Sequence, residues 1–122
     1  MREIKFRAWH TPFGGNKFGQ KFVYGNKTLS FQSMNPDSYV LEQYTGINDI
    51  NGVEVYEGDI IKFHVVMLSP DDKVGYVKYY PEYGYSIMLS LGRVLRQEYW
   101  ASGDKHTIEV IGNIHENEEL LQ

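Results

Sequence analysis

The sequence predicts a mainly β protein that folds as a small barrel or sandwich of short antiparallel strands. Three observations support this class: strand-like runs recur about every ten residues, turn residues separate them, and aromatic and glycine residues are abundant. Aromatic residues make up 15% of the chain, including ten tyrosines, and there are 12 glycines. Closing such a sheet would remove exposed strand edges, which otherwise invite aggregation.

The composition is that of a soluble globular protein. Of the 122 residues, 42% are hydrophobic and 23% charged, which argues against disorder along the whole length. The chain contains no cysteine, so disulfides and thiolate metal sites are excluded and a reducing compartment is favoured. Charged residues interleave the apolar residues near the N-terminus, so we expect neither a signal peptide nor a membrane span.

The charge is unevenly distributed. A formal net charge of −4 argues against non-specific DNA binding, because such binding depends on many basic side chains that contact phosphates. Residues 1–30 nevertheless carry six basic side chains against one acid. A local basic face in this region is therefore compatible with the sequence.

The N-terminal third contains several predicted strands. Residues 3–9 alternate, with Phe6 and Ala8 on one face and Arg7 and Trp9 on a solvent face. Further strands are predicted at 21–24, 28–31 and 39–44, the last ending at Thr45-Gly46.

The central stretch, residues 41–63, has the densest alternation of strand runs and turn residues. A tight turn is predicted over Asp49–Gly52, and another at Glu57–Asp59. We expect the carboxylates of Asp49 and Asp59 to cap backbone N–H groups beside these turns.

The pattern of the C-terminal half predicts a β-meander. Strands are predicted at 60–67, 74–80, 85–89 and 107–111. Residues 93–100 fit neither the strand nor the helix period. Asn117, followed by two acids, predicts a short terminal helix that docks through Leu120 and Leu121.

We expect one domain over residues 1–122. Its predicted parts are an N-terminal β lobe at 1–44, a barrel core at 45–116 and a terminal helical turn at 117–122.

Three blocks of sequence resemble the YopX family of phage- and prophage-encoded proteins. They are the N-terminal REIKFRAW, the central LEQYTGINDINGVEVYEGDIIKF and the C-terminal EVIGNIHENEELL. The resemblance implies an SH3-like β-barrel and localisation in the cytoplasm of the bacterial host cell. It implies no catalytic residues and no function.

No motif predicts catalysis or a cofactor. The four histidines lack the i, i+2 or i, i+4 spacing that lets two side chains share a metal, and Gly14-Gly15 lacks P-loop spacing. The central carboxylates have no partner nucleophile and are better explained as turn caps or outward strand residues. We therefore expect no enzyme, no cofactor and no metal.

A tyrosine run is the feature least explained by folding alone. On one strand Tyr76, Lys78 and Tyr80 face opposite to Val77, and Tyr83 and Tyr85 follow. Surface tyrosines give rigid contact area with a polar tip, so our first hypothesis is a non-enzymatic module that binds an unknown host or phage protein. The alternative is packing between strands of a two-sided sheet.

The second hypothesis is a module that binds single-stranded nucleic acid, because rings beside basic side chains stack on bases. The overall acidity disfavours it. Its candidate residues are the basic and aromatic ones of the N-terminal third: Lys5, Arg7, Trp9, Lys17, Phe18, Lys21 and Phe22. Self-association through exposed strands and tyrosines is a further hypothesis.

Overall fold

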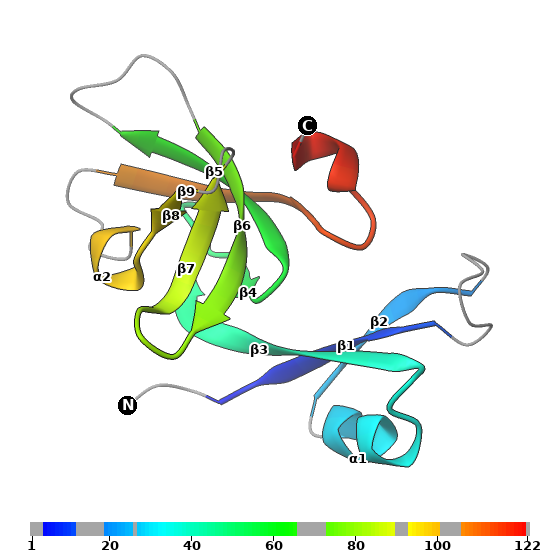
Figure 1. Cartoon of the computed structure of the whole chain (residues 1–122). Helices are drawn as coiled ribbons and strands as arrows, with labels where there is room; N and C mark the ends of the chain where they lie inside the picture. The colour runs from blue at the N-terminus through cyan, green and yellow to red at the C-terminus, as the bar shows by residue number, and fades with distance from the viewer. Residues whose placement is uncertain are drawn as a thin grey trace. The chain divides into compact units, whose positions relative to one another are not determined.

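The structure is a computed structural model that describes residues 4–11, 19–25, 27–65, 73–89, 93–100 and 106–121. The chain divides into two compact units, Met1–Gly46 and Ile47–Gln122. Two antiparallel sheets make it mainly β, as the sequence predicts (Figure 1).

The helices and strands lie in the following order along the chain. In the first part of the chain they are β1 (Phe6–His10), β2 (Lys21–Tyr24), α1 (Lys27–Met34), β3 (Tyr39–Asn48) and β4 (Glu54–Tyr56). In the second part they are β5 (Asp59–Val65), β6 (Lys73–Tyr80), β7 (Gly84–Leu89), β8 (Val94–Leu95), α2 (Gln97–Trp100), β9 (His106–Asn113) and the 3-10 helix η2 (Glu118–Leu121).

The first sheet has the order β2-β1-β3-β4. In register, Trp9 of β1 lies between Phe22 of β2 and Val40 of β3. The predicted end of a strand at Thr45-Gly46 is wrong: β3 continues to Asn48, and Gly46 has a φ of +86° inside it.

The strand predicted at 28–31 is also wrong, because this segment belongs to helix α1. The hydroxyl of Thr28 donates to the carbonyl of Gly25 at 2.7 Å, and the Thr28 side chain is fully buried. A helix satisfies its backbone groups internally, so the segment needs no neighbouring strand. The helix packs against β1 and β2.

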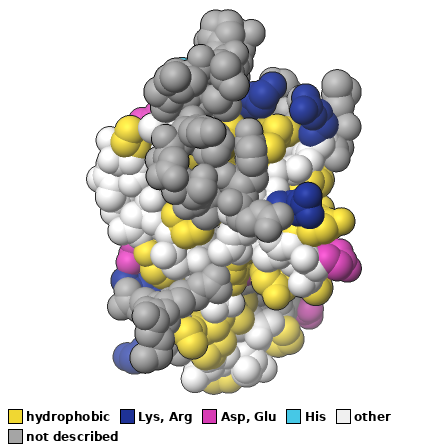
Figure 2. Space-filling view, turned by 90° about the vertical axis from the view of Figure 1, so that its left-hand side faces the viewer, with side chains coloured by type: hydrophobic (Ala, Val, Ile, Leu, Met, Phe, Trp, Pro, Cys, Tyr) yellow, Lys and Arg dark blue, Asp and Glu magenta, His cyan; other side chains and the backbone are white. Residues whose placement is uncertain are grey.

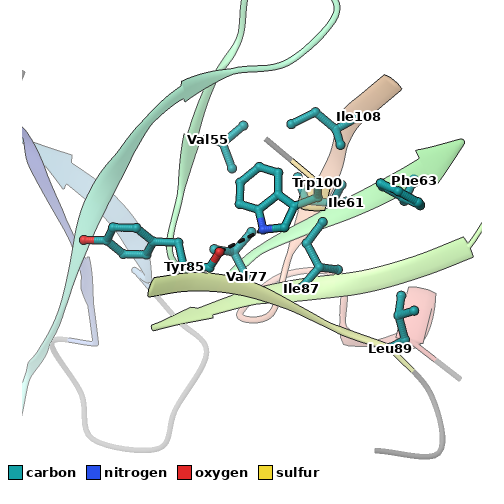
Figure 3. Close-up of a cluster of buried hydrophobic side chains, with 9 residues drawn as sticks. All are labelled: Val55, Ile61, Phe63, Val77, Tyr85, Ile87, Leu89, Trp100 and Ile108. Atoms are coloured by element: carbon teal, nitrogen blue, oxygen red, sulfur yellow. Dashed lines mark hydrogen bonds between the residues drawn. The ribbon is translucent and has the colours of Figure 1, made fainter. Parts of the chain in front are cut away.

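The second sheet has the order β8-β7-β6-β5-β9 and curls into a half-barrel (Figure 1). Val77 of β6 pairs with Ile87 of β7, and Phe63 of β5 pairs with Ile108 of β9, so these four side chains point to one face. That face carries the hydrophobic core of the second unit (Figure 3). Its buried members are Val55, Ile61, Phe63, Val77, Tyr85, Ile87, Leu89, Trp100 and Ile108.

The ambiguous segment 93–100 forms a two-residue strand and then one helical turn. Its Trp100 is 2% exposed and lies among the core side chains, where its indole N–H donates to the carbonyl of Tyr85 at 2.8 Å (Figure 3). The nearby Gln97 Oε1 accepts from the N–H of Tyr85 at 2.9 Å. Neither periodicity fits because the segment changes from strand to helix within eight residues.

The predicted terminal helical turn is confirmed as the 3-10 helix η2, which packs against β6. Leu120 stays 38% exposed and Leu121 is half-buried. Among the described residues, no helix is long and apolar enough to cross a membrane.

Candidate functional site

The β6–β7 hairpin carries all five residues proposed for partner binding. Because Val77 points into the core and is 2% exposed, Tyr76, Lys78 and Tyr80 lie on the other face of β6. Lys78 is exposed, while the rings of Tyr76 and Tyr80 are half-buried.

Two tyrosine rings and two cations form a continuous row at the end of this hairpin. The ammonium of Lys78 lies 5.3 Å from the ring centre of Tyr80, whose ring centre lies 6.2 Å from that of Tyr83. The guanidinium of Arg96 lies 5.4 Å from the ring centre of Tyr83. We call Lys78, Tyr80, Tyr83 and Arg96 the cation-tyrosine row. Such contacts of a cation with a ring face are favourable by about 0.5–1 kcal/mol at exposed sites.

Hairpin and helix contacts hold the row in place. The N–H of Tyr83 donates to the carbonyl of Tyr80 at 3.1 Å, which closes the turn between the two rings. The hydroxyl of Tyr80 lies 3.0 Å from the sulfur of Met88 on the paired strand. The Gln97 contact with Tyr85 anchors the start of α2, so the neighbouring Arg96 is held beside the hairpin.

The row remains open to solvent. Tyr83 is 44% exposed, and both cations are exposed. More generally, Figure 2 shows one face of the molecule, on which some Lys and Arg side chains lie next to hydrophobic ones. A rigid ring next to a positive charge is the kind of surface that contacts partner proteins.

Not every residue of the predicted set joins the row. Tyr85 is 3% exposed and belongs to the core, and the ring of Tyr79 packs against it at 5.1 Å while staying 48% exposed. Tyr76 shares the face of Lys78. Sequence reasoning missed Arg96, because it lies in the segment of ambiguous period and no local pattern links it to the hairpin.

The nucleic-acid set is differently placed. Arg7 is buried, its Nε donating to Glu42 at 2.8 Å, and its guanidinium lies 4.1 Å from the ring centre of Phe22. Trp9 is 5% exposed and meets Phe22 edge to face at 4.8 Å. The solvent face predicted for Arg7 and Trp9 is therefore wrong: the sheet is covered on both sides here, and the buried charge is paired.

Of the other members of that set, the structure describes Lys5 and Lys21. The ammonium of Lys5 lies 5.6 Å from the ring centre of Tyr44, and Lys21 is exposed at the end of β2. Lys17 and Phe18 lie outside the described residues.

The central carboxylates bind backbone groups, as predicted. Asp49 is 7% exposed, and its Oδ1 accepts from the N–H groups of Asn51 and Val53, both at 2.8 Å. Asp59 is 3% exposed and accepts from the N–H of Tyr56 at 2.8 Å. Within the part of the chain that the structure describes, no group of three or more His, Asp or Glu side chains is placed to hold a metal ion.

Comparison with known proteins gives the family. The model of the family described as "YopX protein" matches residues 15–122. The chain belongs to the YopX family. The resemblance of its sequence blocks is thereby confirmed for the central and C-terminal blocks, while the N-terminal block precedes the matched residues.

A solved structure is similar to the chain over its whole length. Protein EF1440 from Enterococcus faecalis is 26% identical, the match covers 100% of both chains, and the TM-score is 0.55. No curated protein matches the chain.

The C-terminal YopX block has a clear structural role. Asn113 Oδ1 accepts from the N–H groups of His115 and Glu116, both at 3.0 Å, and Asn117 Oδ1 accepts from the N–H of Asn113 at 3.2 Å. A Cβ at Gly112 would lie 2.7 Å from Asn117 Oδ1, so a larger residue would disturb this turn. These residues shape the turn at the end of β9.

Proposed function

We propose that this YopX family protein is a non-enzymatic module, built on an SH3-like barrel, that binds a host or phage protein through its cation-tyrosine row. The observation that carries the proposal is the exposure of Lys78, Tyr83 and Arg96 in one continuous row, at the end of a hairpin whose other face is packed in the core. Folding requires the core face. It does not require two cations stacked on two rings at the surface.

The placement of the acids supports binding over catalysis. The two buried central carboxylates accept hydrogen bonds from backbone N–H groups, and this use explains their burial. We place the protein in the cytoplasm of a bacterial host cell, which the resemblance to phage-encoded proteins supports. Self-association stays a prediction, and light scattering measures it directly.

Single-stranded nucleic acid is the weaker candidate. Two of its seven residues, Arg7 and Trp9, are buried, so they offer no ring or charge to a base or phosphate. We treat nucleic acid binding as an outcome of the tests and not as a second proposal.

The test is affinity capture from a bacterial cell extract, with the wild-type chain and the double variant Tyr80→Ser/Tyr83→Ser as baits. A specific protein should be retained by the wild type and lost with the double variant. Tyr24→Ser is the matched control, because Tyr24 is a 59% exposed tyrosine outside the row. The control should retain the protein.

Equal capture by the double variant and the wild type would refute the role of the row, provided that circular dichroism shows both folded. Capture that disappears after nuclease treatment would point to nucleic acid and also refute the proposal.

A further inference from the structure

The region around the row differs in charge from the rest of the chain. Residues 73–100 carry four basic side chains, Lys73, Lys78, Arg93 and Arg96, against two acids, although the whole chain has a net charge of −4. All four basic side chains are exposed. The segment that carries the row thus holds more basic than acidic side chains, although η2, which packs against β6, adds the exposed acids Glu118 and Glu119.

We propose that the cation-tyrosine row recognises an extended acidic segment of a protein, with carboxylates at both ends and apolar or aromatic side chains between them. The inference rests on the proposed function and names the chemistry of its partner. The carboxylates pair with Lys78 and Arg96, while the middle of the segment packs on Tyr80 and Tyr83.

The geometry of the row sets an upper limit on the spacing of the acids. Its three successive contacts, of 5.3, 6.2 and 5.4 Å, limit how far apart the two cations can lie. An extended chain advances about 3.3 Å per residue, so about five residues span the row at most. Two acids with no more than about four residues between them can therefore reach both cations.

The turn between the rings argues for an uncharged middle. Glu82 lies in this turn and is exposed. A carboxylate placed near it would be repelled, whereas the ends of the segment meet the cations. The row therefore discriminates against a uniformly acidic chain as well as against a neutral one.

The cation-ring contacts preorganise the two cations for carboxylate binding. A cation held over a ring is already oriented, so less side-chain entropy is lost when a carboxylate binds. Because the planar guanidinium of Arg96 can bind a carboxylate through two parallel hydrogen bonds, this end should be the more selective one.

The test is an NMR titration of the isotope-labelled chain with synthetic peptides of about eight residues. The first peptide has aspartates near both ends and phenylalanine in an uncharged middle. In the second, asparagines replace the aspartates. The third probe is an oligothymidine of similar length. We expect the first peptide to shift the amide signals of the β6–β7 hairpin and of α2, the second to bind at least about fivefold more weakly, and the oligothymidine not to shift these signals.

Variants assign the effect to the row. Lys78→Ala and Arg96→Ala should each weaken the acidic peptide about two- to fivefold, and raising the salt concentration should weaken it further. Lys27→Ala removes an exposed cation outside the row and should change nothing. Arg96→Lys should restore only part of the affinity that Arg96→Ala loses.

Equal binding of the aspartate and asparagine peptides, or shifts unaffected by the Lys78 and Arg96 variants, would overturn the inference. Hairpin shifts with oligothymidine that exceed those with the acidic peptide would also overturn it, in favour of nucleic acid. If the capture experiment retains a protein through the row while the acidic peptide fails, the function stands and only the acidic specificity is refuted.

Discussion

Asp49 and Val110 are 61 residues apart in the sequence, yet the Asp49 carboxylate accepts a hydrogen bond from the Val110 N–H at 2.9 Å. Beside it, the N–H of Ile50 donates to the carbonyl of Ile108 at 3.0 Å. The turn that follows β3 therefore bonds to the edge of β9 opposite β5. One carboxylate both shapes that turn and ties it to the sheet.

The first prediction concerns this carboxylate. Asp49→Ala should lower the free energy of unfolding by about 3 kcal/mol, because three N–H groups lose a charged acceptor in a buried place. Asp49→Asn keeps one oxygen acceptor and should cost less. Urea unfolding measures both. Asp37→Ala, at an exposed position, is the control and should change stability by less than about 0.5 kcal/mol. A similar small change for Asp49→Ala would contradict the role assigned to it.

The second prediction concerns Trp100. Trp100→Ala should cost about 3–5 kcal/mol, since it empties the centre of the core and removes the bond to Tyr85. Trp100→Phe should cost clearly less. Leu29→Ala is the control, because Leu29 is 43% exposed and offers little burial to lose. Thermal unfolding followed by circular dichroism ranks the three variants, and an equal loss for Trp100→Ala and Leu29→Ala would count against this account of the core.

The third prediction concerns the buried ion pair. Arg7→Met removes the positive charge that pairs with the buried Glu42 carboxylate and should cost about 3–5 kcal/mol. The double change Arg7→Met/Glu42→Leu should cost much less than the two single changes added together, because no unpaired charge remains. A double-mutant cycle by chemical denaturation tests this, and simple additivity would show that the two side chains are not coupled.

The fourth prediction compares two glycines with positive φ. Gly52 has a φ of +82°, and a Cβ added there would have nothing within 4 Å, so Gly52→Ala should cost only the backbone strain of about 1–2 kcal/mol. Gly84 has a φ of +75°, and a Cβ there would meet Gln97 Oε1, the acceptor for Tyr85. Gly84→Ala should therefore cost about 1 kcal/mol more. Equilibrium unfolding compares the variants, and equal losses would mean that the Gln97 contact adds nothing.

Local patterns were enough to predict much of the fold. The meander β5–β6–β7 and the turn caps Asp49 and Asp59 follow from alternation and turn chemistry, which act between near neighbours. Segment 28–31 could not be placed from its own residues, because the buried Thr28 contact with Gly25 and the packing of α1 on β1 and β2 decide its conformation. Tertiary packing overrides a weak local preference.

The candidate site was also predicted only in part, and the residues that local patterns predicted differ from those that depend on tertiary packing. Alternation along β6 was enough to put Lys78 and Tyr80 on the face opposite Val77, since the period of a strand is a local property. The same alternation could not predict that Arg96 belongs to the row, because the position of Arg96 beside Tyr83 depends on the docking of α2 through Gln97. Nor could it show that Arg7 is buried, because burial depends on what covers the sheet and on the distant partner Glu42.

The side chains of α2 also protect an edge of the sheet. Strand β8 is only two residues long and pairs with Ile87 and Met88, while Gln97 and Trp100 take up the N–H and the carbonyl of Tyr85. A longer β8 would expose unpaired backbone groups with which a strand of another molecule could pair. Here the Gln97 amide and the Trp100 indole satisfy the edge of β7 instead, and side chains offer no such pairing surface. The molecule thereby gains resistance to edge-to-edge polymerisation along β7.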